Sequence, residues 1–111
     1  DMVNFLEEFD RFDSALYRRD KLKVDEQKAR EILPHVLKCL EALSDWSEEG
    51  LYAALSQCAA GIGAKIGQVM WCMRIAITGR ESTPGGATEM AHLLGKERTI
   101  KRISQSIEWL S

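Results

Sequence analysis

The chain has 111 residues, of which 45% are hydrophobic and 29% charged, and its formal net charge is −2. These values are typical of a folded soluble domain, and they exclude a disordered chain or a membrane span, because no apolar run approaches the roughly 20 residues that a span needs. The three cysteines are scattered and lack Cys-x-x-Cys spacing, which argues against a disulfide framework or a zinc site and favours a reducing cytoplasm.

The N-terminal part of the chain predicts short helical pieces followed by an interrupted helix. Because it begins with Asp1 and not with methionine, we expect a piece of a longer protein. Residues 2–9 place their apolar side chains on one helical face, and residues 10–24 predict short helical turns. Asp25 is a favourable N-cap for a helix over 26–33. A proline inside a helix costs about 3 kcal/mol, so Pro34 predicts the start of a second helix, over 34–43.

The next two helices are predicted from glycine and serine signals and from apolar spacing. Ser47 is expected to cap a helix that Gly61 and Gly63 end. The helix over 64–77 is apolar on two faces, so we expect it to be central, with Arg74 at the edge of its main apolar stripe.

Two more helices are expected, over 84–94 and 96–110. In the last one, Arg98, Lys101 and Arg102 are expected on the outer face. Since no strand pattern occurs, the predicted fold class is all-α, a multihelical chain of two small packed helical subdomains. We expect their boundary between an N-terminal part, 1–45, and a C-terminal part, 46–111.

The segment between the predicted central helix and its successor has the composition of a small binding site. Gly79 stands where a helix C-cap requires a positive φ, and Thr83-Pro84 has the form of an N-cap followed by the first helical residue. Glycines in that first turn indicate that another group approaches the backbone closely. A helix N-terminus of this kind suits a nucleobase or a phosphate. The candidate site residues are Arg74, Arg80, Thr83, Pro84, Gly85 and Gly86.

Charge is distributed unevenly along the chain. Residues 1–60 hold 8 Lys/Arg against 13 Asp/Glu, whereas residues 61–111 hold 7 against 4. Basic charge is therefore concentrated in the half that carries the candidate site. A net charge of +3 suits contact with a few nucleotides better than tight, sequence-blind binding to a duplex.

Each candidate also has a structural interpretation. Arg74 could form an ion pair with a nearby carboxylate, and Arg80 has the character of a solvated turn residue. Lys96 and the basic residues that follow it are typical of a solvated helix face. The three tryptophans are expected in the core rather than on stacking platforms. His35 and His92 lack a nucleophilic partner at recognisable spacing, and no P-loop or zinc pattern occurs, so no catalytic or metal-binding residue is predicted.

Residues 73–103, MRIAITGRESTPGGATEMAHLLGKERTIKRI, resemble the C-terminal anticodon-binding region of bacterial-type glutamyl-tRNA synthetases. The likeness rests on Arg-x-Ala-x-Thr-Gly at 74–79, Thr-Pro-Gly at 83–85 and Leu-Leu-Gly-Lys-Glu-Arg at 93–98. A weaker match begins at Trp46-Ser47, and the likeness is strong over 46–110 and loose over 1–43. Many relatives have a bulky Leu and a Phe directly after Pro-Gly, where this chain has Gly86 and Ala87.

The resemblance implies an all-helical appendage that holds the anticodon loop of tRNA-Glu. In that family, ATP- and Mg-dependent glutamylation occurs on an upstream nucleotide-binding-fold domain whose motifs are absent from these 111 residues. By resemblance, the chain itself should bind without catalysing and without a cofactor, in the cytoplasm, as a monomer attached to those upstream domains. Matching the family's motif, Arg74, Thr83 and the Pro84-Gly85 turn are expected to touch the anticodon.

Two other functions remain open from the residues alone. Residues 87–95 followed by 96–103 also have the pattern of a helix-turn-helix DNA-binding module, with Gly95 in the turn. The low net charge disfavours this interpretation. The other alternative is a helical protein-interaction module in which the glycine-rich turn is purely structural.

Overall fold

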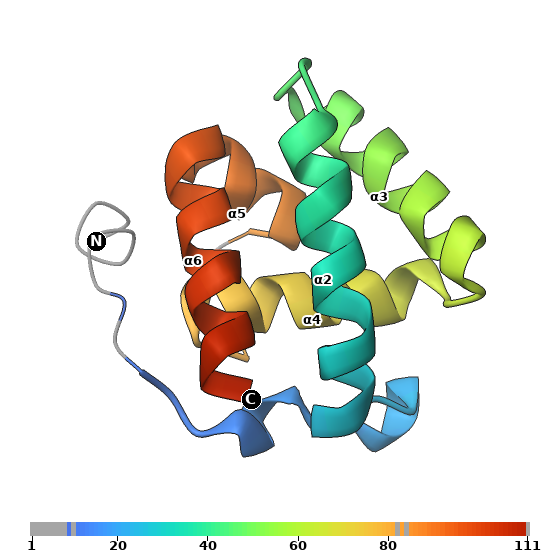
Figure 1. The fold of residues 1–111 in the computed structure, drawn as a ribbon, viewed down its shortest axis with the longest axis vertical. Coiled ribbons are helices and arrows are strands. Elements are labelled where there is room, and N and C mark those ends of the chain that lie inside the picture. Colours follow the sequence, from blue (N-terminus) through green and yellow to red (C-terminus); the bar gives the residue numbers. More distant parts are fainter. Residues whose placement is uncertain (1–8, 10, 82, 84, 111) are drawn as a thin grey trace.

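The computed structural model describes residues 9, 11–81, 83 and 85–110, and over these residues the chain is helical, without strands (Figure 1). The predicted all-α fold class is therefore confirmed. The short helical turns predicted within 10–24 are present as 3-10 helices, whereas the helix predicted over 2–9 lies, apart from Phe9, outside the described residues. The elements are η1 (Ser14–Tyr17), η2 (Asp20–Leu22), α2 (Glu26–Ala42), α3 (Glu48–Ile62), α4 (Ile66–Thr78), α5 (Ala87–Leu94) and α6 (Lys96–Leu110). None of the described helices is long and apolar enough to cross a membrane.

The predicted break at Pro34 is wrong, because α2 continues through the proline. Asp25 caps its start as predicted, accepting a hydrogen bond from the Lys28 N–H at 2.8 Å. Pro34 is on the exposed side of the helix, where the carbonyl that loses its partner can be hydrated. The opposite side is buried on both sides of the proline, at Ala29, Ile32, Leu33, Val36 and Leu40. Burial of this unbroken stripe against other helices outweighs the local cost of the proline.

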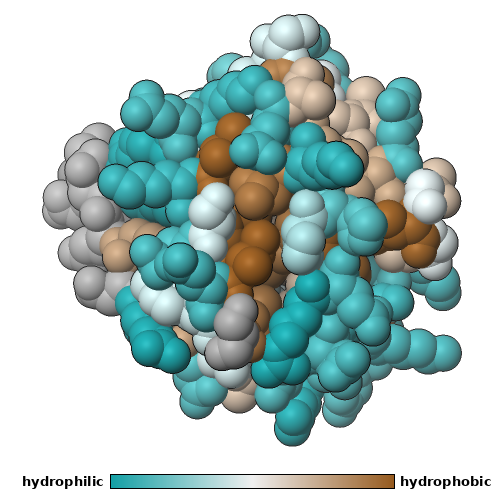
Figure 2. Space-filling view, viewed as in Figure 1, coloured by the Kyte–Doolittle hydropathy of each residue, from teal (hydrophilic) through white to brown (hydrophobic). Residues whose placement is uncertain are grey.

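Helices α2 and α6 run side by side in opposite directions, and each supplies a cation to the end of the other (Figure 1). The Lys96 Nζ donates to the carbonyl of Leu43 at 2.7 Å, just after the end of α2. The Arg30 Nε donates to the carbonyl of Leu110 at 2.7 Å, at the end of α6. Both bonds place a positive charge at the negative end of a helix dipole. In the space-filling view, apolar side chains form a strip where the two helices meet (Figure 2).

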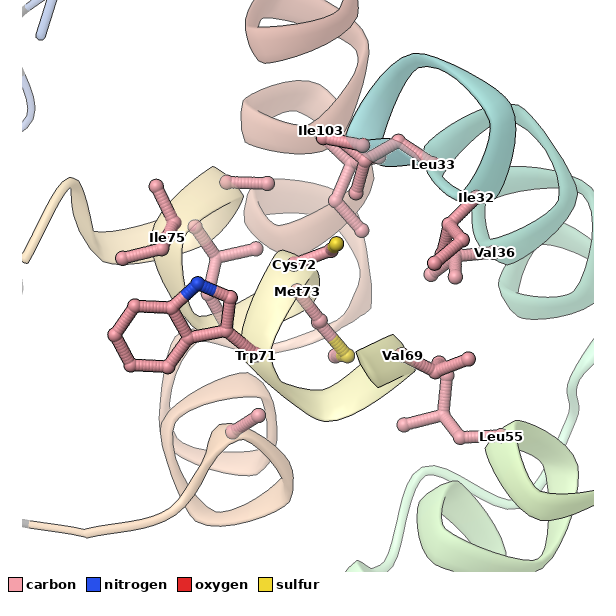
Figure 3. Close-up of a cluster of buried hydrophobic side chains, with 14 of the residues drawn as sticks. Ile32, Leu33, Val36, Leu55, Val69, Trp71, Cys72, Met73, Ile75 and Ile103 are labelled. Carbon is pink, nitrogen blue, oxygen red and sulfur yellow. The ribbon is translucent and has the colours of Figure 1, made fainter. Parts of the chain in front are cut away.

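Helix α4 is the centre of the fold, as its two apolar faces predict. It packs against α2, α3, α5 and α6, and Figure 3 shows its side chains meeting those of α2, α3 and α6. Trp71 is buried, and its indole N–H donates to the carbonyl of Tyr17 at 2.9 Å, which confirms its predicted place in the core. Trp46 is half-buried and donates to the carbonyl of Ala91 at 2.9 Å. The buried residues of α4 are Gln68, Val69, Trp71, Cys72, Met73, Ile75, Ala76, Ile77 and Thr78.

Replacing Pro34 with alanine is expected to stabilise the chain by about 1–3 kcal/mol. Alanine restores an intrahelical N–H donor and removes the ring clash, and the gain is reduced by the greater freedom of the unfolded chain. Urea unfolding followed by circular dichroism measures the change, with Lys38→Ala at another exposed position of α2 as the control. A loss of stability in Pro34→Ala would show that the proline itself is required for the path of α2.

Alkaline pH is expected to destabilise the fold through buried acidic groups. Burial raises the pKa of the Cys72 thiol to about 12, with Lys28 opposing the shift, and burial also raises the pKa of the Tyr17 hydroxyl. The folded state therefore holds these protons more tightly than the unfolded chain does, so this stabilisation is complete below about pH 8 and is lost as pH rises from about 9 to 12. Urea unfolding at pH 7, 9 and 10.5 should show the decline, and Cys72→Ala should reduce its slope. If the free energy of unfolding does not change across this pH range, the buried thiol and hydroxyl are not the cause of alkaline destabilisation.

Candidate nucleic-acid interface

The candidate segment begins at the C-terminal end of α4, where Gly79 ends the helix in the predicted way. Gly79 has a φ of 67°, and its N–H donates to the carbonyl of Ile75 at 2.7 Å. A Cβ at this position would lie 2.9 Å from Cδ1 of Phe12. The position therefore requires glycine both for its backbone conformation and for the packing of Phe12.

Four carbonyls near the C-terminal end of α4 accept hydrogen bonds although this end of the helix is buried. Helix α6 contributes two of the donors, and the turn itself contributes the other two. The acceptors are Arg74 (from Thr78 Oγ1, 2.6 Å), Ile75 (from the Gly79 N–H, 2.7 Å), Ala76 (from Ser106 Oγ, 2.6 Å) and Ile77 (from Arg102 Nη1, 2.9 Å). Because an unpaired buried carbonyl costs about 1–3 kcal/mol, these bonds fix the position of the turn relative to α6.

Arg102 was expected on the outer face of α6, and this expectation is wrong. Its side chain is 9% exposed, because the guanidinium donates to the Ile77 carbonyl and lies 4.6 Å from the ring centroid of Phe9. Sequence reasoning also missed Ser106. The sequence did contain a signal for both residues, because their spacing puts them on the same helical face as buried apolar residues. The buried positions of α6 are Thr99, Arg102, Ile103, Ser106 and Leu110.

Arg74 lies at the edge of the core, half-buried, as its place on the helix predicts. Its Nη1 is 3.4 Å from the carbonyl oxygen of Glu81, across the turn. Within the described residues the guanidinium meets this backbone oxygen and no carboxylate, so the ion-pair interpretation is not what the structure shows. One N–H of Arg74 thus holds the turn, and the guanidinium has four others.

Thr78 organises the turn, although sequence reasoning did not single it out. Its hydroxyl donates to the Arg74 carbonyl and accepts from the backbone N–H of Arg80 at 3.1 Å. The Arg80 side chain is exposed. A threonine in the last turn of a helix commonly donates to the carbonyl four residues back. The position of Thr78 directly before Gly79 could therefore have predicted this hydrogen bond.

The helix after the turn begins later than predicted, and Thr83 does not cap it. Helix α5 begins at Ala87, with Gly86 as its N-cap, and the Met90 N–H donates to the Gly86 carbonyl at 3.0 Å. The hydroxyl of Thr83 instead donates to the carbonyl of Gly85 within the turn. Pro84, the predicted first helical residue, lies outside the described residues.

The two glycines of the turn differ in their surroundings. A Cβ at Gly85 would overlap the carboxylate of Glu89, which folds back from the first turn of α5. The predicted close approach to Gly85 is therefore made by this side chain, whose negative charge is favourable at a helix N-terminus. At Gly86 a Cβ would meet no atom of the described residues within 4 Å, so this part of the turn is open to them.

No metal centre accompanies the turn in the described part of the chain. No group of three or more His, Cys, Asp or Glu residues there is placed to hold a metal ion. His92 is used structurally, since its Nδ1 lies 2.9 Å from the carbonyl oxygen of Trp46. The described groups that the turn presents are the Arg74 guanidinium, the backbone at Gly86 and the Glu89 carboxylate beside Gly85.

Comparison with known proteins places the chain in one family. The family model described as "Anticodon binding domain" matches residues 1–107. The chain is 37% identical to the glutamate–tRNA ligase of Lachnoclostridium phytofermentans over 111 residues, which are 100% of this chain and 23% of that protein. It is 34% identical to that of Clostridium tetani over 110 residues, 99% of this chain and 22% of that protein.

A solved structure has the same fold. The crystal structure of a glutamate tRNA ligase from Elizabethkingia meningosepticum, in complex with its amino acid, superimposes with a TM-score of 0.74 at 24% identity. The match covers 90% of this chain and 19% of the other. The chain thus spans less than a quarter of the length of the curated relatives it matches.

The two glycines at the ends of the turn are expected to respond differently to alanine. Gly79→Ala should lower the free energy of unfolding by about 1–2 kcal/mol, because a left-handed conformation is strained for alanine. Gly86→Ala should lower it by less than about 1 kcal/mol, since alanine is a poorer N-cap than glycine but the φ of −74° suits any residue. Urea unfolding of both variants tests the turn geometry. If both substitutions lower the free energy of unfolding equally, the described geometry is contradicted.

Proposed function

The chain belongs to the anticodon binding domain family, and from this premise we propose that it holds the anticodon loop of tRNA-Glu for a glutamate–tRNA ligase. On this proposal the chain binds RNA and the chemistry, with ATP and Mg, occurs on upstream domains of a longer polypeptide. It would act in the cytoplasm as a monomer. The division into subdomains 1–45 and 46–111 stays a prediction.

The proposed contacts are Arg74, Arg80, Thr83, Pro84, Gly85 and Gly86. The observation that carries the proposal is the position of Arg74, whose guanidinium lies beside the turn with its Nη1 3.4 Å from the Glu81 carbonyl oxygen. A planar guanidinium placed in this way can stack on one base and donate to another. The open surroundings of Gly86 allow a base to approach the backbone there.

The helix-turn-helix alternative is disfavoured by the use of the cations on α6. A recognition helix presents its basic side chains to a groove. Here the ammonium of Lys96 donates to carbonyls at the end of α2, and Arg102 is buried against α4. Two of the four cations on this helix therefore serve the fold.

Arg74→Ala is expected to weaken binding of an anticodon stem-loop of tRNA-Glu by about tenfold or more, since one well-placed arginine contact is worth about 1–3 kcal/mol. Arg74→Lys keeps the charge and loses the planar fork, so it should also weaken binding. Nuclear magnetic resonance titration of the labelled chain measures affinity and maps the contact, with a scrambled anticodon and Lys38→Ala as controls. If no residue within 74–86 changes its chemical shift when the stem-loop binds, the proposed site is contradicted.

The same substitution separates binding from catalysis in a full-length ligase that contains this chain. Arg74→Ala should impair tRNA charging and leave activation of glutamate nearly intact, because the residue is proposed to act on the RNA alone. Equal losses in the two assays would show that Arg74 is structural.

A further inference from the structure

An acidic side chain from α5 lies within the turn that is proposed to contact RNA. Glu89 is the third residue of α5, and its carboxylate folds back from the helix onto the backbone of Gly85. It occupies the space in which a Cβ at Gly85 would lie. The side chain is half-buried, so its direction toward the turn is part of the packing of this region. A negative charge is therefore placed among the groups that a nucleotide would meet.

The hydrogen-bonding capacity of Glu89 is not used by the fold. A glutamate three residues after an N-cap commonly accepts a hydrogen bond from the N-cap N–H, which here belongs to Gly86. Within the described residues the Glu89 carboxylate accepts no hydrogen bond and forms no ion pair. Its charge is favourable beside the N-terminus of α5, but both oxygens keep their lone pairs for another donor.

A donor group lies at the other side of the same turn. The Arg74 guanidinium is directed to the Glu81 carbonyl oxygen, at 3.4 Å from Nη1, and not to the Glu89 carboxylate. Two side chains of opposite charge thus belong to one turn without pairing with each other. A ligand bound between them would meet N–H donors from Arg74 and carboxylate acceptors from Glu89.

The edge of a pyrimidine base distinguishes these two kinds of group. Cytosine carries an amino group, which donates, next to a ring nitrogen and a carbonyl oxygen, which accept. Uracil carries a carbonyl oxygen where cytosine has its amino group. Carboxylates accept from the cytosine amino group, whereas a uracil carbonyl facing a carboxylate would bring two acceptors together. Donors at Arg74 and an acceptor at Glu89 therefore match cytosine and disfavour uracil.

We propose that Glu89 is a specificity-determining residue, whose carboxylate accepts a hydrogen bond from the amino group of a cytosine bound at the turn. Arg74 donates to the acceptors of the same base. The inference rests on the proposed function, and it adds a residue outside 74–86 together with the chemistry of the base that this residue selects. Because a carboxylate also repels phosphates, Glu89 contributes to discrimination between bases more than to total affinity.

Stem-loops that differ in one amino group test the inference. Each cytosine of the anticodon is replaced in turn by uracil, and separately by pyrimidin-2-one, which keeps the two acceptors and lacks the amino group. At one position the unchanged chain should prefer cytosine by about tenfold. Glu89→Gln should reduce the preference over uracil to about threefold or less, because the amide can accept from cytosine or, turned round, donate to uracil. Nuclear magnetic resonance titration measures each affinity.

Glu97→Gln is the matched control. Glu97 is an exposed residue in the first turn of α6, beyond the other end of α5, and the substitution removes the same charge. The preference for cytosine should stay at about tenfold in this variant. Urea unfolding of both variants confirms that each is folded before the affinities are compared.

The ratio of affinities separates a role in specificity from a structural one. If Glu89→Gln weakens binding of all stem-loops by the same factor, the residue only supports α5 and the inference is overturned. A chain that binds through residues 74–86 without preferring cytosine at any position also overturns it, while the proposed site stands. If the unchanged chain does not bind the native stem-loop, the proposed function and the inference both fail.

Discussion

The buried C-terminal end of α4 is the constraint on which the rest of this fold depends. A helix end inside a protein leaves carbonyls that water cannot reach, and each one without a partner costs about 1–3 kcal/mol. Domains of this size are stable by only about 5–15 kcal/mol, so two such losses would remove much of the total. The chain meets this need with Arg102 and Ser106, which donate to carbonyls at the end of α4. This requirement explains why these two polar side chains are buried on the face of α6 that packs against the core.

The same hydrogen bonds prepare the proposed binding surface. Thr78 and Gly79 close the end of α4, and the Arg74 guanidinium reaches across the turn to the Glu81 carbonyl, so these groups have their places in the chain before a ligand arrives. Groups that are already ordered lose little conformational entropy on binding. A few contacts can then discriminate between nucleotides even where the electrostatic attraction is weak.

Local signals predicted most of the fold, and tertiary contacts account for the errors. Asp25, Ser47 and Gly79 were predicted correctly as caps because each acts within a few residues of itself. Pro34 was misread because the burial of α2 on both sides of it is not a local property. Thr83 was misread because α5 begins later, at Ala87 with Gly86 as its N-cap, and Arg102 because its acceptor is 25 residues away in the sequence. The RNA contacts at 74–86 stay predictions, since their evidence is the resemblance and the geometry of one turn.

The net charge of −2 limits the long-range attraction that the chain can offer to RNA, and several of its cations also hold helix ends. Lys96 and Arg30 serve the ends of α2 and α6, and Arg102 serves the end of α4. These three side chains keep their charge, but they are already used in hydrogen bonds and are less available for direct contacts with phosphates. Long-range attraction would be weak, and affinity would have to come from short-range contacts at a preformed surface. Such a domain suits a role in which other parts of a larger protein bring the RNA close and this chain tests the identity of a few bases.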